Sequence, residues 1–465
     1  MRIEKDTMGE ISLPEECYYG AQTQRAFDNF QISSTKIPRS MIAAIAMIKR
    51  SAAIVNNNLN FIDTKIKDAI VKACDEVIQG KFDDQFIVDI YQTGSGTSSN
   101  MNANEVIANR ACEILGGNKG DKKLVHPNDH VNYGQSSNDV IPTSIHIATS
   151  LEIDKRLLPE LEHLKISIDK KTDEFKDIIK IGRTHLQDAT PITLGQEFSG
   201  YSKMIENSIQ RIKNDLPFLL KLAQGGTAVG TGINTHKDFG KLIAHELSVI
   251  TGLNFTESDN HFESQATQDS VVHLSGSLKT LSVSLYKIAN DIRWLGSGPR
   301  SGLGELVLPP VQPGSSIMPG KVNPVICESL IQVTSQVVGY DSAIALGGMG
   351  GVFELNLMLP LIGSNILESI NILSNGMKMF REKLLNDLSA NKNKCNGYIE
   401  DSLAMCTSLA PIIGYDKAAS IAKKAFKNDK TVREVCIEDK ILNNEELEKI
   451  LDPFSMIQPN DDNKK

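Results

Sequence analysis

The chain has 465 residues, of which 40% are hydrophobic and 23% are charged, a balance that is typical of folded globular proteins and unlike that of disordered ones. The net charge of −8 at pH 7 disfavours nucleic acid and anionic membranes as general partners. Domains are most often about 100–150 residues long, so the length allows about three of them.

Targeting segments and cysteine motifs in the sequence bear on the compartment in which the protein works. No apolar run reaches the roughly 18 residues that suggest a membrane span, and residues 1–6 lack the apolar core of a signal peptide. The seven cysteines are scattered and form no Cys-x-x-Cys pair, so we expect neither a disulfide framework nor a cysteine metal site. We expect a cytoplasmic protein.

Strand signals are few and lie near the two ends of the chain. The segment from Arg2 to Leu13 predicts a short hairpin that leads into a turn around Pro14. A smaller C-terminal unit is expected to begin at 408–411, and the polar tail from Pro459 to Lys465 is expected to fray.

Most of the chain between these ends is predicted to be helical. Apolar positions between 147 and 175 indicate one long helix in which Pro159 marks a kink or a restart, and others follow at about 194–222, 325–345 and 353–380. The clearest pattern is a seam of apolar residues with spacings that alternate between three and four: Val271, Leu274, Leu278, Leu281, Leu285, Ile288, Ile292 and Leu295. Such a seam is typical of a long helix in a bundle. We therefore expect a central bundle of five long helices.

The length of these helices also bears on assembly. A helix of about 30 residues extends about 45 Å, which is longer than a small domain is wide. Long seams often meet across subunits, so we predict a homo-oligomer. The alternative is that the seam packs within one chain.

Two serine-rich loops are candidate anion sites. The run 93–100 combines glycines with hydroxyls, which can direct donors at an anion, although ordinary loops have the same composition. The run 135–139 (Gln-Ser-Ser-Asn-Asp) resembles a helix N-cap, which is also a sufficient explanation for it.

Two further loops contain histidines. In the run 126–130, two imidazoles lack the cysteine or glutamate that would complete a recognisable ligand set, so we do not expect a metal there. His185 lies in the polar run 182–188, and a histidine that titrates near neutral pH suits proton transfer. We take His185 as a candidate catalytic residue.

The most informative loop is 314–324 (Gly-Ser-Ser-Ile-Met-Pro-Gly-Lys-Val-Asn-Pro), which brings two hydroxyls, one cation and one amide into a flexible segment that is typical of a hinged lid. Glu328 follows at the start of a predicted helix, where it either orients a histidine or favours the helix dipole. The loops together offer donors and a histidine without a nucleotide-binding glycine motif or a thiol nucleophile. This set of groups fits a small dicarboxylate substrate. Its weakly acidic proton would be removed while hydrogen-bond donors stabilise the doubly charged aci-carboxylate that forms. Lys321 and Asn323 suit the stabilising role.

These residues carry a resemblance that covers essentially the whole chain. The runs 6–11 (Asp-Thr-Met-Gly-Glu-Ile), 20–25 (Gly-Ala-Gln-Thr-Gln-Arg) and 100–105 (Asn-Met-Asn-Ala-Asn-Glu), together with the loops above, resemble the class II, metal-independent fumarases of the fumarase/aspartase superfamily. Aspartate ammonia-lyases typically carry Gln in place of His185 and Ser-Thr-Asn in place of 136–138. Gly320 and the run 414–419 (Gly-Tyr-Asp-Lys-Ala-Ala) also look like fumarase.

The resemblance implies a fumarate hydratase, which hydrates fumarate reversibly to (S)-malate through an aci-carboxylate intermediate, a step of the tricarboxylic acid cycle. Ser315 would take the C3 proton as an alkoxide, with Lys321, Asn323 and backbone donors stabilising the charges. His185, paired with Glu328 of another subunit, would protonate the leaving hydroxyl. The carboxylates of the substrate would be bound by Ser95, Gly96, Thr97, Ser136, Ser137, Asn138, Thr184, Ser316, Lys321 and Asn323. A second anion site would use His126, Asn128 and Asp129.

The resemblance also implies the architecture: a mainly α fold in which the five-helix bundle joins a twenty-helix core in a homotetramer, with active sites shared among three subunits and with no metal or organic cofactor. We expect a mostly helical N-terminal domain over 1–136, the bundle over 137–393 and a small C-terminal domain over 394–465. Three departures from relatives are Lys123 in place of arginine, Tyr133-Gly134 in place of Lys-Ser, and Ala410 in place of asparagine. An aspartate ammonia-lyase and a non-catalytic structural relative remain the alternatives.

Overall fold

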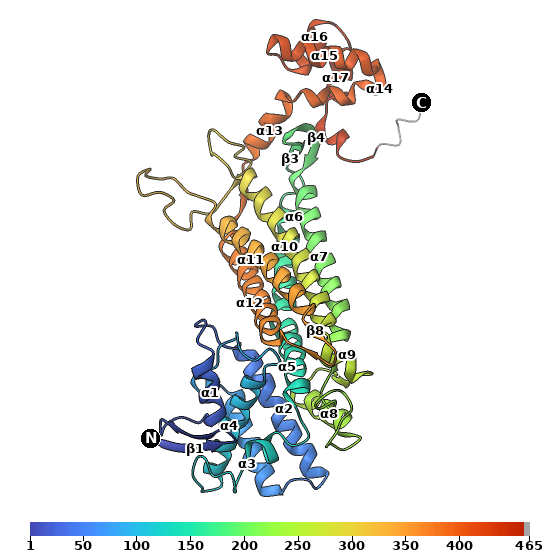
Figure 1. The fold of residues 1–465 in the computed structure, drawn as a ribbon. Coiled ribbons are helices and arrows are strands. Elements are labelled where there is room, and N and C mark those ends of the chain that lie inside the picture. Colours follow the sequence, from blue (N-terminus) through green and yellow to red (C-terminus); the bar gives the residue numbers. More distant parts are fainter. Residues whose placement is uncertain (460–465) are drawn as a thin grey trace. The chain divides into compact units, whose positions relative to one another are not determined.

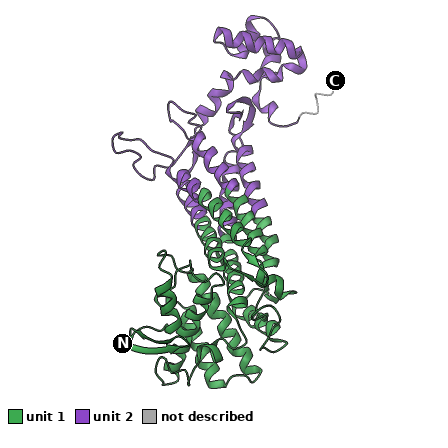
Figure 2. Cartoon of the chain, viewed as in Figure 1, with its two compact units in different colours: residues 1–159, 209–282, 334–374 green, residues 160–208, 283–333, 375–465 purple. Residues whose placement is uncertain are grey.

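The computed structural model describes residues 1–459, and the end of the polar tail lies outside this range. The described chain is mainly helical with a few short strands, as predicted (Figure 1). It divides into two compact units, coloured separately in Figure 2. Unit 1 comprises residues 1–159, 209–282 and 334–374, and unit 2 comprises 160–208, 283–333 and 375–465. Because this division runs across the long helices, the three domains expected from the sequence stay a prediction.

The N-terminal part of unit 1 begins with the expected hairpin, whose turn lies at 7–8, and the expected turn follows at Pro14, where Cys17 N donates to Pro14 O at 3.3 Å. The elements of this part are β1 (Arg2–Asp6), β2 (Gly9–Leu13), α1 (Ala21–Asn29), α2 (Arg39–Asn58), α3 (Thr64–Ile78), η1 (Asp83–Gln85), α4 (Thr97–Ile114) and the π-helical turn η2 (Pro127–Val131). Helix α2 packs against α3, α5 and α8, so it runs through the centre of this part.

Five long helical runs form the middle of the described chain, and within each unit their segments pack side by side (Figure 1). They are α5 (Ser137–Glu152) continuing through η3 (Ile153–Leu157) into α6 (Leu158–Glu174), α7 (Leu194–Leu219), α10 (Asp269–Leu295), α11 (Val325–Gly348) and α12 (Leu359–Lys383). The restart expected at Pro159 is the π-helical turn η3, which places the proline in the first turn of α6, where its missing N–H costs nothing. Helix α12 begins later than predicted because residues 351–356 form the hairpin β8–β9.

The seam of α10 is fully internal. All eight seam positions are at most 4% exposed in a single chain. The seam therefore packs within one chain and gives no support for an oligomer, so the homo-oligomer stays a prediction. No helix among residues 1–459 has the length and apolarity needed to cross a membrane.

Short elements connect the long helices. In unit 1 they are β5 (Lys221–Leu222), α8 (Phe239–Thr251), β6 (Thr256–Glu257), α9 (His261–Ala266), β8 (Gly351–Val352) and β9 (Leu355–Asn356). In unit 2 they are β3 (Ile179–Thr184), β4 (Gln187–Thr193), β7 (Leu306–Val307), η4 (Leu385–Asp387) and β10 (Ser389–Ala390). The expectation that strands lie only near the chain ends is wrong, since β3 and β4 form an antiparallel hairpin in the middle of the sequence.

The C-terminal segment of unit 2 consists of short helices around a core of their own. They are α13 (Lys392–Asp401), η5 (Leu403–Ser408), α14 (Ala410–Ile413), α15 (Tyr415–Asn428), α16 (Val432–Glu438), α17 (Asn444–Ile450) and η6 (Pro453–Met456). Their buried residues include Leu409, Ala425 and Val435, and Ile181 of β3 packs into the same cluster. Apolar side chains thus anchor the β3–β4 hairpin to this segment.

Candidate active site

The Ser315 loop, residues 314–323, contains no helix or strand and belongs to unit 2. The Ser315 Oγ accepts two backbone hydrogen bonds, from Ile317 N at 3.2 Å and from Met318 N at 3.0 Å. Two N–H groups that converge on one oxygen stabilise negative charge on it. The loop therefore supplies the donors that a serine alkoxide requires.

The neck of this loop is closed by two further hydrogen bonds. Gly314 N donates to Lys321 O at 2.8 Å, and Asn323 Nδ2 donates to Gly314 O at 2.6 Å. A Cβ at position 314 would lie 2.8 Å from Asn323 N and closer still to Lys321 O, so only glycine fits there. Asn323, predicted to stabilise the intermediate, also holds the loop shut.

A cavity of about 540 Å³ in unit 2 adjoins the base of the loop. Lys321 and Asn323 line it together with Arg293 and Trp294 at the end of α10. Ser316 and Lys321 are exposed, so their side chains are available to a ligand.

His185 lies in a tight turn and not in an extended loop between helices, which corrects the sequence-based expectation. Thr184 pairs with Gln187, so His185 and Leu186 are the two turn residues of the β3–β4 hairpin, with φ of 56° and 60°. Such two-residue turns normally use asparagine and glycine, because other residues adopt positive φ at a cost of about 1–2 kcal/mol each. The turn presents Thr184 and His185 at the exposed tip of the hairpin.

A buried ion-pair cluster anchors this hairpin. Arg183 binds the fully buried Glu305 through two hydrogen bonds of 2.8 and 3.0 Å. Lys180 Nζ lies 3.0 Å from Glu197 and 3.5 Å from Glu305. Two parallel hydrogen bonds between a guanidinium and a carboxylate fix orientation, so Glu305 ties the strand that leads to His185 to the segment that precedes the Ser315 loop. Glu305 was not among the residues selected from the sequence.

Glu328 lies in the first turn of α11, as predicted. Within residues 1–459 of one chain, no hydrogen bond or ion pair joins it to His185. Both residues belong to unit 2, together with Thr184, Ser315, Ser316, Lys321 and Asn323.

The remaining predicted residues belong to unit 1. Three hydroxyls form a chain there: Ser95 Oγ lies 2.8 Å from Thr97 Oγ1, which lies 2.7 Å from Ser137 Oγ. Gly96 adopts φ of 73° at the N-cap of α4, and a Cβ there would lie 2.9 Å from the Ile141 side chain. The structure thus brings the loops before α4 and α5 together at the N-termini of both helices, which favour anions.

Ser136 and Asp139 form a capping box at the start of α5, so the structural explanation for this motif is confirmed. Asp139 is fully buried, and its second oxygen accepts N–H from Gly225 at 3.1 Å and Thr227 at 2.9 Å. Burial raises the pKa of Asp139 to about 6, against the N–H groups that favour its charged form. Asn138 Nδ2 donates to Ala228 O at 2.8 Å. Asp139 thereby fixes the loop 225–228 against the serines.

A larger cavity, of about 940 Å³, adjoins these loops within unit 1. Its lining brings Thr97, Ser136 and Ser137 of the predicted binding loops together with Asn128 and Asp129 of the predicted second anion site. It also includes Asn132, which the sequence did not single out, and Asn100 and Gln135, which lie in the selected runs but were given no role. Their position in the sequence could have identified them, because each lies about one turn from, or directly before, a residue selected for binding.

The loop of the predicted second anion site is ordered by its histidine. His126 Nδ1 accepts N–H from Asn128 and Asp129, each at 3.1 Å, and caps the turn η2. Asn128 and Asp129 are exposed at the cavity. Tyr133, one of the departures from relatives, stacks on Phe61 with ring centroids 5.3 Å apart and lines the same cavity.

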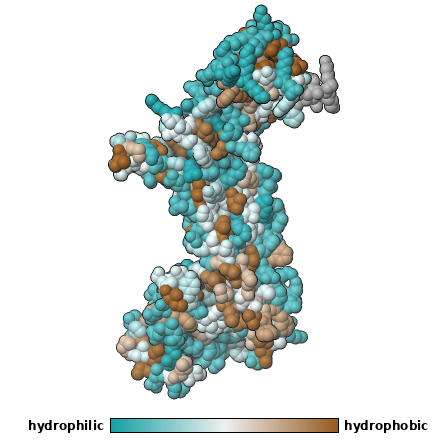
Figure 3. Space-filling view, turned by 45° about the horizontal axis from the view of Figure 1, so that its top comes forward, coloured by the Kyte–Doolittle hydropathy of each residue, from teal (hydrophilic) through white to brown (hydrophobic). Residues whose placement is uncertain are grey.

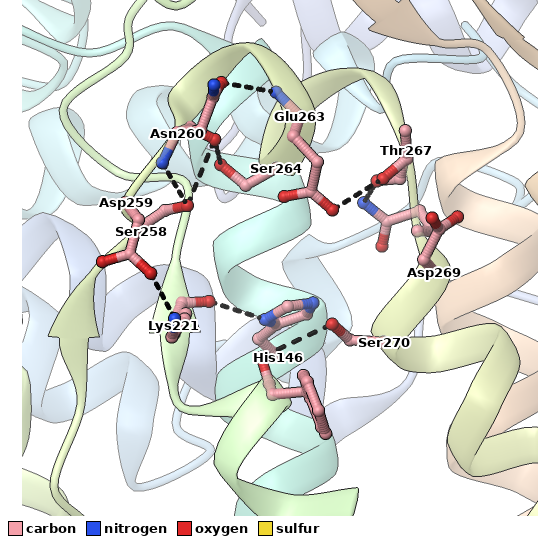
Figure 4. A pocket seen from close by; sticks show the side chains of 12 residues that line it. His146, Lys221, Ser258, Asp259, Asn260, Glu263, Ser264, Thr267, Asp269 and Ser270 are labelled. Atoms are coloured by element: carbon pink, nitrogen blue, oxygen red, sulfur yellow. Dashed lines mark hydrogen bonds and ion pairs between the residues drawn. The ribbon is translucent and has the colours of Figure 1, made fainter.

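Another cavity, of about 200 Å³, lies in unit 1 away from the predicted residues (Figure 4). His146 and Lys221 face it, and the ring Nδ1 of His146 is 2.9 Å from Lys221 O. Burial lowers the pKa of His146. Among residues 1–459, no three His, Cys, Asp or Glu side chains come together as a metal-ion site.

Comparison with known proteins places this geometry in a family. Residues 9–339 match the family described as "Lyase", and residues 405–458 match the "Fumarase C C-terminus". The chain is 51% identical to a protein of Methylorubrum extorquens named "Fumarate hydratase class II", over 98% of this chain and 97% of that one. It is 52% identical to the "Fumarate hydratase, mitochondrial" of Dictyostelium discoideum, over 98% of this chain and 94% of that one. The crystal structure of a class II fumarase from Schistosoma mansoni is similar, with a TM-score of 0.96 and 41% identity over 99% of this chain and all of that one.

Proposed function

The chain belongs to the class II fumarate hydratase family, and we propose from that premise that it hydrates fumarate reversibly to (S)-malate, a step of the tricarboxylic acid cycle, with the residues described above as its active site. The observation that carries the assignment of the base is the pair of N–H groups of Ile317 and Met318 on Ser315 Oγ. A serine hydroxyl is too weak an acid to serve as a base unless its alkoxide is stabilised.

In the direction of dehydration, the Ser315 alkoxide takes the C3 proton of malate and becomes a hydroxyl. The electron pair of the broken C–H bond moves into the adjacent carboxylate and gives the doubly charged aci-carboxylate. Lys321 and Asn323 stabilise this charge as it forms, because a cation and an amide donor act more strongly on the intermediate than on the substrate.

Departure of the C2 hydroxyl completes the reaction. His185 donates a proton toward the leaving oxygen through water, so that the electron pair returns to form the double bond of fumarate and water is released. Glu328 of a neighbouring subunit orients and charges the imidazole. Two observations support a partner from another subunit. His185 lies at the exposed tip of the β3–β4 hairpin, and within the described part of one chain it makes no hydrogen bond to Glu328.

The two substrate carboxylates are bound by donors that different subunits contribute. We assign to this role Ser95, Gly96, Thr97, Ser136, Ser137, Asn138, Thr184, Ser316, Lys321 and Asn323. The hydroxyl chain from Ser95 to Ser137 supports the assignment, because each hydroxyl can turn its proton toward an anion. His126, Asn128 and Asp129 form the second anion site, through which substrate enters.

We propose a homotetramer in which each active site combines residues of three subunits. Helix α11 supports this, since its 24 residues include no lysine or arginine and only two carboxylates, Glu328 and Asp341. Val338 and Leu346 on this helix are 39% and 65% exposed in one chain. Exposed apolar side chains on a helix with so few charges are typical of a contact surface, and apolar surface shows along the long helices in Figure 3.

The steps above are proton transfers and the departure of a hydroxyl, so we propose no resident metal or organic cofactor. We place the enzyme in the cytoplasm, which fits seven cysteines that all carry free thiols. Fractionation of source cells with an antibody to the chain would test the compartment.

The test of function is a rise in fumarate absorbance after purified, EDTA-treated protein is added separately to (S)-malate and to L-aspartate. The proposal predicts a rise with malate alone. A rise with aspartate alone would make the protein an ammonia-lyase, and no rise with any fumarate-forming substrate would indicate a non-catalytic relative.

A further inference from the structure

Lys49 of α2 is a lysine with no exposed surface. Its Nζ donates to Asn132 Oδ1 at 2.6 Å and to Gln135 Oε1 at 3.1 Å. Within residues 1–459, no carboxylate lies within ion-pair distance of it. A buried ammonium bound only to neutral oxygens lacks the counter-charge that normally accompanies it.

The groups around Lys49 do not remove this imbalance. Asp139 of α5 and the thiol of Cys74 on α3 are the titratable groups that face it. Asp139 already accepts several N–H groups. The other groups are neutral amides: Asn132, the C-cap of η2, and Asn100 of α4, which donates to Asn132. The buried residues of α8 are apolar apart from a glycine. Burial lowers the pKa of Lys49 to about 7, partly opposed by Asp139, and raises that of Cys74 beyond the physiological range.

The two partners of Lys49 connect it to the cavity of about 940 Å³. Asn132 and Gln135 both line that cavity. Because their oxygens point at Lys49, their amide nitrogens point the other way: Asn132 Nδ2 donates to Gln135 O at 3.0 Å, and Gln135 Nε2 donates to Val131 O at 3.1 Å. The ammonium thus orients two amide dipoles and the backbone that leads into Ser136.

We propose that Lys49 is the buried counter-charge of the dicarboxylate, and that binding of the dianion in this cavity is coupled to uptake of one proton from solvent by the Lys49 amine. The inference rests on the proposed function, since it needs a dianion in this cavity. An anion behind the two amides stabilises the ammonium over the amine, and by linkage the ammonium tightens binding of the anion by the same factor. Lys49 is a positioning and electrostatic residue, because it acts through Asn132 and Gln135.

The test is isothermal titration of the full-length protein with succinate, a dicarboxylate with neither a double bond nor a leaving hydroxyl, in buffers of different ionisation enthalpy. At pH 8 we expect uptake of roughly 0.5–1 proton per site, since the free amine is mostly neutral and the bound form mostly charged. The dissociation constant of succinate should rise by up to about tenfold per pH unit above pH 7.

Three variants locate the proton. Lys49→Arg keeps the charge with a group that does not titrate in this range, so it should bind succinate without net uptake. Lys49→Met should lose uptake and weaken binding at pH 6.5 at least tenfold, the pH at which wild-type Lys49 is charged. Lys65→Met, at an exposed position of α3, is the matched control and should behave as wild type.

Binding of succinate by the wild type without buffer-dependent heat would overturn the inference and leave the proposed function intact. This measurement needs only the wild-type protein, so it decides the question even if the variants fail to fold. Uptake that persists in Lys49→Arg would also overturn it. Absence of succinate binding in protein that turns over malate would refute the inference alone. Absence of both binding and turnover would remove the proposed function with it.

Discussion

The neck of the Ser315 loop offers a direct test of how backbone geometry controls catalysis. In Gly314→Ala, the new Cβ would lie 2.8 Å from Asn323 N and closer to Lys321 O, distances that real Cβ atoms do not adopt. The neck has to open, and both hydrogen bonds across it, Gly314 N to Lys321 O and Asn323 Nδ2 to Gly314 O, are lost or lengthened. We expect the loop to populate open conformations in which Asn323 no longer faces the intermediate.

The size of the effect follows from those two bonds. Each hydrogen bond contributes about 0.5–1.5 kcal/mol net, so their loss costs about 2 kcal/mol. Because each 1.36 kcal/mol corresponds to a tenfold change in rate, kcat/KM for malate should fall roughly 30-fold. The loop packs little against the folded core, so the melting temperature should hardly change.

The assay compares kcat/KM and melting temperature for wild type, Gly314→Ala and Gly397→Ala. Gly397 is an exposed glycine of α13, and a Cβ added there would have no atom within 4 Å, so its substitution should leave activity unchanged. A Gly314→Ala protein with kcat/KM within about threefold of wild type, a span far below the 30-fold expected, would refute the reasoning. So would an equal loss in both variants, because that would point to a general effect of added methyl groups.

Three further predictions concern other parts of the molecule. His185→Asn should lower kcat on the order of 10²-fold, the contribution typical of a general acid, with circular dichroism unchanged; a rate near that of wild type would contradict its role. Leu281→Asp combined with Leu285→Asp should unfold the subunit and abolish turnover, because both side chains are fully buried within one chain, and a folded, dissociated monomer on size exclusion would be the opposing result. For Lys49, burial lowers the pKa of the folded state to about 7 from its ordinary value of 10.5, so its destabilising effect is full below pH 7 and decreases as pH rises toward 10. The free energy of unfolding of wild type relative to Lys49→Met should therefore increase as pH rises from 7 to 9 in urea titrations, and a constant difference would show that Lys49 does not titrate there.

The helical framework was largely predictable because its signal is periodic and local. The seam from Val271 to Leu295 identifies α10, and the capping pattern at Ser136 marks the start of α5. The partner of the seam was not predictable, since apolar periodicity says that a face is buried without saying by which chain. The structure shows that the same chain covers it.

The hairpin that carries His185 was missed for an identifiable reason. Its turn uses His185 and Leu186 at positive φ, where the recognisable signal would be asparagine followed by glycine. Alternation in the run 179–182 was a weak hint of a strand, whereas residues 187–193, which pair with it, carry no such alternation. A strained turn at this position is the kind of local conflict that functional sites tolerate.

The buried residues that contact the candidate site residues could not be identified from the sequence. Glu305 meets Arg183 across 122 positions, and Lys49 meets Asn132 across 83. Neither lies in a motif whose spacing implies a contact, so only the tertiary structure joins them. The candidate catalytic residues themselves were accessible because they cluster in polar loops next to glycines and prolines.

Ser315 as the catalytic base is the central claim, and Ser315→Ala tests it with two measurements on one protein. Turnover of (S)-malate should fall on the order of 10³-fold, since a positioned base contributes about 10²–10⁴, while the dissociation constant for succinate stays within a few-fold of wild type. A variant that binds succinate and retains more than about a tenth of the wild-type rate would contradict the claim, because the contribution of a base would then be missing.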